Sequence, residues 1–115
     1  MKQKSEGLIQ EEIVKWFRDN HYQKGVIFSV PNEAWAKMGL GKAIMYRILK
    51  DLQLTGMLSG ASDLVVAVKG KVLFVEVKDH KGTQKPKQII FQENIERLGL
   101  PYHLVRSLKD FKEIL

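Results

Sequence analysis

Three polar residues, Asp63, Glu76 and Lys78, have the types and the spacing of a divalent-metal site, in which the two carboxylates could hold the ion and the lysine would stand beside them. Glu76 and Lys78 stand two positions apart in a run rich in β-branched residues. Side chains alternate between the two faces of a strand, so these two share one face. Asp63 begins the preceding run of the same kind. Two carboxylates held close together repel each other, and a divalent cation between them removes that repulsion.

The two runs predict a β-hairpin that brings these residues together. Leu64–Val68 and Val72–Val77 are separated by Lys69-Gly70-Lys71. With Lys69-Gly70 at the centre of the turn, Asp63 lies opposite Glu76, and their Cβ atoms are roughly 4.5–5.5 Å apart. A three-residue turn would shift this pairing by one position, which still leaves Asp63 beside Glu76.

The donor set also predicts which metal is bound and what it does. Oxygen ligands without cysteine or histidine favour Mg²⁺ or Mn²⁺ over zinc. Mg²⁺ keeps several waters, and one of them can be activated as a nucleophile. The adjacent Lys78 can stabilise a developing negative charge or help to deprotonate that water. These parts suit phosphodiester hydrolysis on a polyanion.

A Glu-x-Lys pair on a strand is more often a solvated surface pair than a metal site. Three features favour the metal site here. Asp63 lies at the pairing distance, and Gly60 stands just before it, where a backbone must turn tightly. The strand that carries Glu76 is otherwise apolar.

The surrounding elements predict an α/β fold. Apolar residues recur at helical spacing in two segments, 5–20 and 86–98, which we expect to be helices. Ser107-x-x-Asp110 resembles a capping box and predicts a last helix over 107–115. Two more segments are expected to be strands: 26–30 and 101–105. We expect one mixed central sheet flanked by helices, in a single domain of residues 1–115. The helix over 86–98 is expected to use an apolar face of Ile90, Phe91, Ile95 and Leu98.

Residues 31–60 have two interpretations. Residues 42–53 have the periodicity of a helix with an apolar side, whereas the four glycines around them favour a loop or a mobile flap. Trp35 lies in this insert, and both base stacking and a structural role stay open for it.

The composition excludes several kinds of site and favours a polyanionic partner. The 115 residues contain 19 Lys and Arg against 13 Asp and Glu, a net charge of +6, and no cysteine. Disulfides, thiolate metal sites and cysteine nucleophiles are therefore excluded. A positive field attracts nucleic acid first and an anionic membrane second. Because neither a signal region nor a membrane-length apolar run is found, we expect a cytoplasmic protein.

The hairpin residues belong to an ordered set of short motifs that spans nearly the whole chain. Gly60-Ala61-Ser62-Asp63 is followed by Glu76-Val77-Lys78. The other members are Glu6-x-x-x-Gln10, Pro31-Asn32, Gln88-x-x-Phe91, Gly99 and Tyr102. Together they resemble the virus-type replication-repair nuclease (VRR-NUC) branch of the PD-(D/E)XK nuclease superfamily. Ser62 stands where the family usually has proline, which supplies rigidity rather than a ligand.

This resemblance implies a restriction-endonuclease-like fold and a role for each matching residue. Asp63 and Glu76 would bind Mg²⁺ or Mn²⁺ together with the backbone carbonyl of Val77. Lys78 would contact the nucleophilic water or the scissile phosphate. Gln88 would project from its helix toward the site and position phosphate or water.

The family's early acidic residue would reach the metal through water, and three residues compete for this role. Glu6 fits the Glu-x-x-x-Gln pattern, with Glu11 and Glu12 as rivals. Helical spacing makes Glu12 a solvated surface residue. Beside the site, three lysines are expected to contact the DNA backbone without sequence preference: Lys81, Lys85 and Lys87.

These expectations describe an endodeoxyribonuclease that selects branched DNA such as four-way (Holliday) junctions. The resemblance is to stand-alone phage and bacterial enzymes that act as homodimers. Four residues are candidates for the dimer interface: Trp35, Met38, Met45 and Tyr46. One alternative is a non-selective nicking nuclease or an exonuclease with the same catalytic residues. Another is a non-cutting DNA-binding module of the same fold, and the intact Asp63, Glu76 and Lys78 argue against it.

Overall fold

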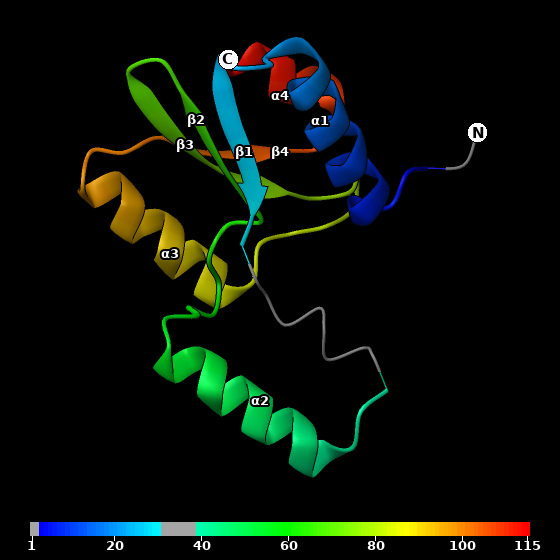
Figure 1. The fold of residues 1–115 in the computed structure, drawn as a ribbon, viewed down its shortest axis with the longest axis vertical. Coiled ribbons are helices and arrows are strands. Elements are labelled where there is room, and N and C mark those ends of the chain that lie inside the picture. The colour runs from blue at the N-terminus through cyan, green and yellow to red at the C-terminus, as the bar shows by residue number, and fades with distance from the viewer. Residues whose placement is uncertain (1–2, 31–38) are drawn as a thin grey trace.

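The computed structural model describes residues 3–30 and 39–115, which form a four-stranded sheet with helices on both faces (Figure 1). The elements in chain order are α1 (Glu6–Asn20), β1 (Gly25–Ser29), α2 (Lys42–Leu54), β2 (Leu64–Val68), β3 (Lys71–Val77), α3 (Pro86–Arg97), β4 (Tyr102–Val105) and α4 (Leu108–Glu113). None of the helices in these described residues is long and apolar enough to cross a membrane.

The sheet is mixed, as expected from the sequence, and its strands follow the order β1-β2-β3-β4. The β1–β2 and β2–β3 pairs are antiparallel, whereas β3 and β4 are parallel. A parallel pair needs a crossover connection, and α3 supplies it. In the hairpin Leu64 pairs with Val75 and Val68 with Lys71, so the turn has two residues and the first of the two expected registers is the observed one.

The hydrophobic core lies between one face of the sheet and the two helices α1 and α4. Ile9, Ile13 and Phe17 of α1 recur at helical spacing and are all buried. They pack with Phe111 of α4 and with alternate residues of the strands, namely Ile27, Leu64, Val66, Leu73, Val75, Val77 and Val105. Full burial of each such side chain contributes about 1.5–3 kcal/mol. This core fixes the hairpin that carries the polar residues.

Each of the three expected helix starts is observed. Ser5 caps α1 by accepting a hydrogen bond from the Leu8 N–H (3.2 Å). Ser107 caps α4 by accepting from the Asp110 N–H (3.0 Å). At the start of α3, the side-chain oxygen of Gln88 accepts from the Lys85 N–H (2.8 Å). This last bond also fixes the Gln88 side chain, which the sequence places near the site.

The predicted apolar face of α3 is wrong in two of its four positions. Ile95 is buried and Phe91 is half-buried, but Ile90 is 56% exposed and Leu98 is 72% exposed. Phe91 packs edge-on against Phe74 of the sheet. The helix therefore touches the sheet along a narrow line through Gln88, Phe91 and Ile95, and the two outer positions fall beside that line.

The helical interpretation of residues 42–53 is confirmed, since α2 covers Lys42–Leu54. None of its side chains is buried. Figure 1 shows α2 set apart from the sheet, beyond the end at which β1 finishes. Four residues singled out in the sequence lie outside the described residues: Pro31, Asn32, Trp35 and Met38.

Candidate active site

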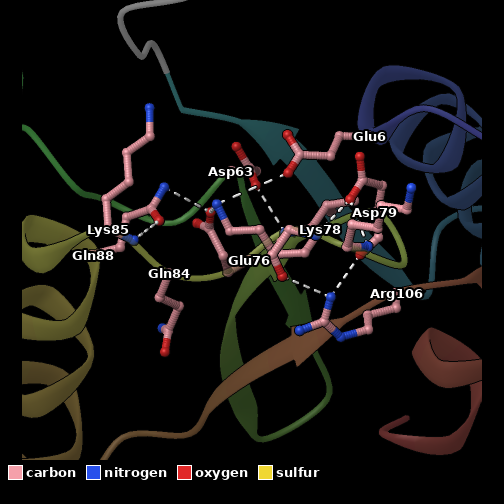
Figure 2. Close-up of polar contacts among 12 residues, drawn as sticks. Glu6, Asp63, Glu76, Lys78, Asp79, Gln84, Lys85, Gln88 and Arg106 are labelled. Atoms are coloured by element: carbon pink, nitrogen blue, oxygen red, sulfur yellow. Dashed lines mark hydrogen bonds and ion pairs between the residues drawn. The ribbon is translucent and has the colours of Figure 1, made fainter.

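The hairpin brings Asp63, Glu76 and Lys78 together at one end of the sheet (Figure 2). Glu76 lies near the end of β3 and Lys78 directly follows the strand. The Lys78 Nζ lies 3.4 Å from Glu76 Oε2. Glu76 is only 1% exposed and Lys78 only 5% exposed. Buried ionisable side chains are rare in proteins, so the pair is not the solvated surface pair that a strand face would ordinarily carry.

The Asp63 residue is held from two sides by backbone groups. Its Oδ2 accepts a hydrogen bond from the Val77 N–H (2.8 Å), across the hairpin. Its backbone carbonyl accepts from the Val30 N–H (2.9 Å), at the end of β1. The preceding Ser62 is fully buried, and its hydroxyl donates to the Leu64 carbonyl (3.2 Å). Ser62 thus satisfies its own polar group within the buried turn.

Glu76 has one oxygen bonded and one oxygen without a donor. Its Oε2 accepts a hydrogen bond from Gln88 Nε2 (3.0 Å), and its Oε1 is buried and has no hydrogen-bond partner within the described part of the chain. Burial, followed by the negative charge of Asp63, raises the pKa of Glu76 to about 8, against the opposing charge of Lys78. An unsatisfied buried polar group costs about 1–3 kcal/mol, and a cation would remove this cost.

The residues present fit a hard divalent cation. The site offers two carboxylates close together and no cysteine, which suits Mg²⁺ or Mn²⁺. In residues 3–30 and 39–115 no group of three His, Cys, Asp or Glu side chains gathers as a metal site. The remaining ligands would therefore be backbone oxygen and water, and Mg²⁺ commonly keeps several waters.

Of the three candidates for the early acid, Glu6 is the one placed beside Lys78. Its Oε1 lies 3.9 Å from Lys78 Nζ, and Figure 2 shows it approaching the cluster from α1. Glu12 instead pairs with Lys4 (2.9 Å). Glu11 is exposed, and no ion pair joins it to the site among the residues the structure describes.

The three lysines expected to contact DNA are all exposed, and they all follow the cluster in the chain, between Lys78 and Gln88. Lys81 belongs to the loop that follows Lys78, whereas Lys85 and Lys87 lie at the start of α3 next to Gln88. Figure 2 shows the Lys85 side chain pointing away from the carboxylates. These lysines are therefore placed to contact a polyanion beside the site, and they are not part of the catalytic cluster itself.

A braced loop next to Lys78 was not identified from the sequence. Arg106 Nη1 donates to the carbonyls of Asp79 (2.6 Å) and Gly82 (2.8 Å). Asp79 Oδ1 accepts from the N–H groups of Lys81 (2.9 Å) and Gly82 (2.6 Å), and these bonds lower the pKa of Asp79. The Asp-x-x-Gly spacing of this turn was a usable signal, but no sequence pattern connects Arg106 to it.

The loop packs tightly against the site at Gly82. A Cβ on Gly82 would lie 3.2 Å from the Lys78 Cδ and 3.2 Å from Glu6 Oε1. Any other residue would push against both side chains at once. The loop therefore limits where Lys78 and Glu6 can lie.

Comparison with known proteins supports the fold and goes no further. No family model matches the sequence, and no curated protein matches it. Among solved structures, a "VRR_NUC domain protein" matches with a TM-score of 0.72 and 14% identity, over 98% of this chain and 86% of the other. A "VRR_NUC domain" matches with a TM-score of 0.62 and 23% identity, over 95% of this chain and 91% of the other. The chain therefore has the VRR-NUC fold, and the expected restriction-endonuclease-like architecture is confirmed.

Proposed function

We propose that this chain, which has the VRR-NUC fold, is a metal-dependent nuclease that hydrolyses phosphodiester bonds in DNA. One observation carries the proposal: Glu76 is buried next to Asp63 and Lys78, with Oε1 lacking a partner among the described residues. A fold does not by itself determine a function. A buried Glu–Lys pair beside a half-buried second acid costs stability, and metal-assisted chemistry gives a reason for keeping it.

The carboxylates of Asp63 and Glu76 would hold Mg²⁺ or Mn²⁺, with the backbone carbonyl of Val77 as a further ligand. When bound, such an ion polarises a phosphoryl oxygen and supplies an activated water. The Val77 N–H fixes one Asp63 oxygen, and the Gln88 amide fixes one Glu76 oxygen. These hydrogen bonds orient the two acids before any substrate arrives.

Lys78 would stabilise the negative charge that develops on the phosphate. Its stem is buried and its ammonium lies within 4 Å of both Glu76 and Glu6. A donor held in a dry site needs little reorganisation when charge develops nearby, which makes it more effective than a solvated lysine. Glu6 would position water at the edge of the site, since it is the more exposed member of the pair.

Exposed lysines beside this centre would hold the DNA backbone. Lys81, Lys85 and Lys87 carry positive charge at the surface of the loop and of the α3 start. Contacts of this kind supply affinity without reading sequence. The net charge of +6 adds long-range attraction for the same polyanion.

The finer part of the proposal is that the protein is a homodimer that selects branched DNA such as four-way junctions. A two-fold dimer would present two equivalent sites to symmetric strands. The apolar side of α2 supports an interface, because none of its residues is fully buried in one copy: Ile44, Met45, Ile48, Leu49 and Leu52. Of the other interface candidates, Tyr46 lies on the opposite side of α2 and is 70% exposed.

A cleavage assay tests the proposed function. A labelled four-way junction and a linear duplex of the same length are incubated with the protein in Mg²⁺, in Mn²⁺ and in EDTA. The proposal predicts cleavage in either metal, none in EDTA, and faster cleavage of the junction. Equal rates on both DNAs would remove the structure selectivity, and no cleavage of any DNA in either metal would remove the nuclease.

A further inference from the structure

Helix α2 carries a basic stripe that begins at the edge of its apolar side, at Lys42, and runs onto the opposite side at Lys50. Lys42, Tyr46 and Lys50 follow one another at four-residue spacing, and Arg47, three residues before Lys50, lies on the far flank of the stripe. Residues four apart lie on the same side of a helix. All four side chains are exposed. The apolar side of the helix is more covered, since Met45, Ile48, Leu49 and Leu52 are half-buried.

The charges of this stripe are not used within the described part of the protein. No ion pair joins Lys42, Arg47 or Lys50 to an acid among residues 3–30 and 39–115. On α1, by contrast, Lys15 pairs with Asp19 at 2.7 Å. Helix α2 has one acid, Asp51, against three basic residues. With respect to the residues that the structure describes, the stripe therefore presents unneutralised positive charge to a partner.

The insert that carries α2 leaves and rejoins the sheet at the candidate active site. It begins after Val30, whose N–H donates to the carbonyl of Asp63, and it ends at Ser62, directly before Asp63. Ser29 pairs with Leu64 at the same end of the sheet. Figure 1 shows α2 beyond this end, on the side toward which β1 points. A polyanion lying in the site would therefore extend toward α2.

The return segment of the insert, which follows α2, is seated against α3. Gly60 has φ +88°, and a Cβ there would collide with the backbone carbonyl of Lys87. Leu58 and Ser59 line a small cavity of about 90 Å³ together with Ile90 and Phe91 of α3. The segment thus rests on the same first turns of α3 that present Gln88 and two of the lysines.

We propose that the α2 stripe of Lys42, Tyr46, Arg47 and Lys50 binds the phosphate backbone of a duplex arm of the DNA substrate, away from the scissile phosphate. Lys42 and Lys50 are separated by roughly 12 Å along the helix axis at 1.5 Å per residue. Duplex DNA presents about seven phosphate charges over that length, at one per 1.7 Å. Each of the three cations could neutralise one of these phosphates. This inference rests on the proposed function, because it assigns a further contact to the same substrate.

A membrane is the competing partner for a basic amphipathic helix. A helix that lies on a membrane buries its apolar side in the lipid and keeps its basic side at the headgroups. In α2 most of the apolar side is already half-covered by the protein, and the basic side is the more exposed one. This arrangement favours a partner that is charged throughout, such as a DNA backbone.

The test compares two triple variants of the full chain in an E76Q background, which prevents cleavage during binding measurements. One variant is K42Q/R47Q/K50Q on α2. The control, K69Q/K71Q/K109Q, loses the same charge from exposed positions at the hairpin turn and on α4. Affinity for a long-armed junction is measured by fluorescence anisotropy across a range of salt concentrations. We expect the slope of log affinity against log salt to fall by about two to three for the α2 variant, roughly one for each phosphate that is no longer neutralised, and by less than one for the control.

A second readout separates arm binding from damage to the site. With Glu76 restored, the α2 variant should show a raised KM on long-armed DNA and an unchanged kcat, and both values should be normal on DNA with very short arms. Equal salt slopes for the two variants would overturn the inference while leaving the nuclease intact. Loss of binding to vesicles of anionic phospholipid, in place of DNA, would overturn it in favour of a membrane. If the chain with Glu76 intact neither binds nor cuts DNA, the proposed function fails and this inference fails with it.

Discussion

Glu76 keeps its proton up to an unusual pH because it is buried beside Asp63. Its pKa is raised to about 8, mainly by burial and then by the Asp63 charge. The folded state therefore holds a proton that the unfolded chain releases near pH 4.5. By linkage, this group's contribution to stability is fully present below that pH and is lost as the pH rises through about 8. A cation bound at the carboxylates would reverse the effect, because it favours the charged form.

The first prediction follows from the direction in which the contribution of Glu76 to stability changes with pH. In EDTA, the free energy of unfolding should fall between pH 5 and pH 8.5, and Mg²⁺ should restore more of it at the upper end. Denaturant titrations of the wild type and of Glu76→Gln measure the effect, with the difference between them isolating Glu76. A wild-type curve that runs parallel to the Glu76→Gln curve across this range would contradict the raised pKa.

The second prediction concerns Lys78. Lys78→Ala should lower the cleavage rate about 10²–10³-fold, the usual loss when one charge-stabilising donor is removed. Divalent-metal affinity, measured by calorimetry, should change little, because the carboxylates remain. Lys81→Ala, at an exposed position in the neighbouring loop, serves as the control and should mainly weaken DNA binding. A Lys78→Ala enzyme as fast as the wild type would reduce Lys78 to a structural partner of Glu76.

The third prediction separates the early acids on α1. Glu6→Gln should reduce the cleavage rate far more than Glu12→Gln, because Glu6 lies next to Lys78 and Glu12 is paired with Lys4. The two variants remove the same charge from the same helix, which makes them matched controls. Single-turnover rates on one junction provide the comparison. The opposite ranking would show that the Glu6-x-x-x-Gln10 motif has been assigned in the wrong register.

At the scale of the elements, the hairpin was predictable and the contacts between distant elements were not. The two-residue turn pairs Leu64 with Val75, and the same register places Asp63 opposite Glu76. Burial of Glu76 and Lys78 was not expected from a strand pattern, because it depends on α3 and on the loop 79–82 covering them. The exposed Ile90 is a second example. Periodicity predicts which face of α3 is apolar, but how many residues of that face are buried depends on how the helix packs on the sheet.

The brace from Arg106 illustrates a contact that sequence could not show. Arg106 follows β4, and it reaches the carbonyls of Asp79 and Gly82 because β3 and β4 are parallel neighbours. Nothing in the local sequence of either segment indicates that pairing. The early acid could be predicted better from the sequence, because helical spacing puts Glu6 and Gln10 on one face of the helix. The structure then places Glu6 next to Lys78.

The fourth prediction tests how the insert is seated on α3. Gly60→Ala should destabilise the fold by more than the left-handed backbone alone costs, about 1–2 kcal/mol, because its Cβ meets the Lys87 carbonyl. Gly99→Ala is the control: its φ of +78° is similar, and nothing lies within 4 Å of an added Cβ. Gly60→Ala should also slow cleavage, since α3 carries Gln88, while Gly99→Ala should not. Equal losses of stability and normal cleavage in both would show that the insert is not held by this contact.

At the scale of the whole molecule, the exposed apolar residues bear on the oligomeric state. The apolar side of α2 is not fully buried in one copy, and Leu54 at the end of the helix and Leu58 after it are also exposed. Apolar and aromatic residues and methionine are enriched at interface cores. A dimer would double the net charge of +6 and strengthen attraction to DNA at low salt.

The fifth prediction is that the protein is a dimer in solution at micromolar concentration. Multi-angle light scattering should give about twice the 13.2 kDa chain mass. Ile48→Asp should shift it toward the monomer and lower the preference for junctions, because a charge on the apolar side of α2 opposes burial there. Lys50→Asp, on the other side of the same helix, should leave the mass unchanged. A wild-type monomer, both free and with junction DNA, would argue for a general nuclease.

The most direct measurement of the central claim is cleavage and binding of one labelled junction by the wild type, Asp63→Asn and Glu76→Gln in Mg²⁺. Each variant keeps the size of its side chain and removes the charge that would hold the metal. Binding should survive in both variants, because phosphate contacts come mainly from lysines, while cleavage should be abolished. Full Mg²⁺-dependent cleavage by either variant would contradict the account, because the metal could then not be held by these two carboxylates.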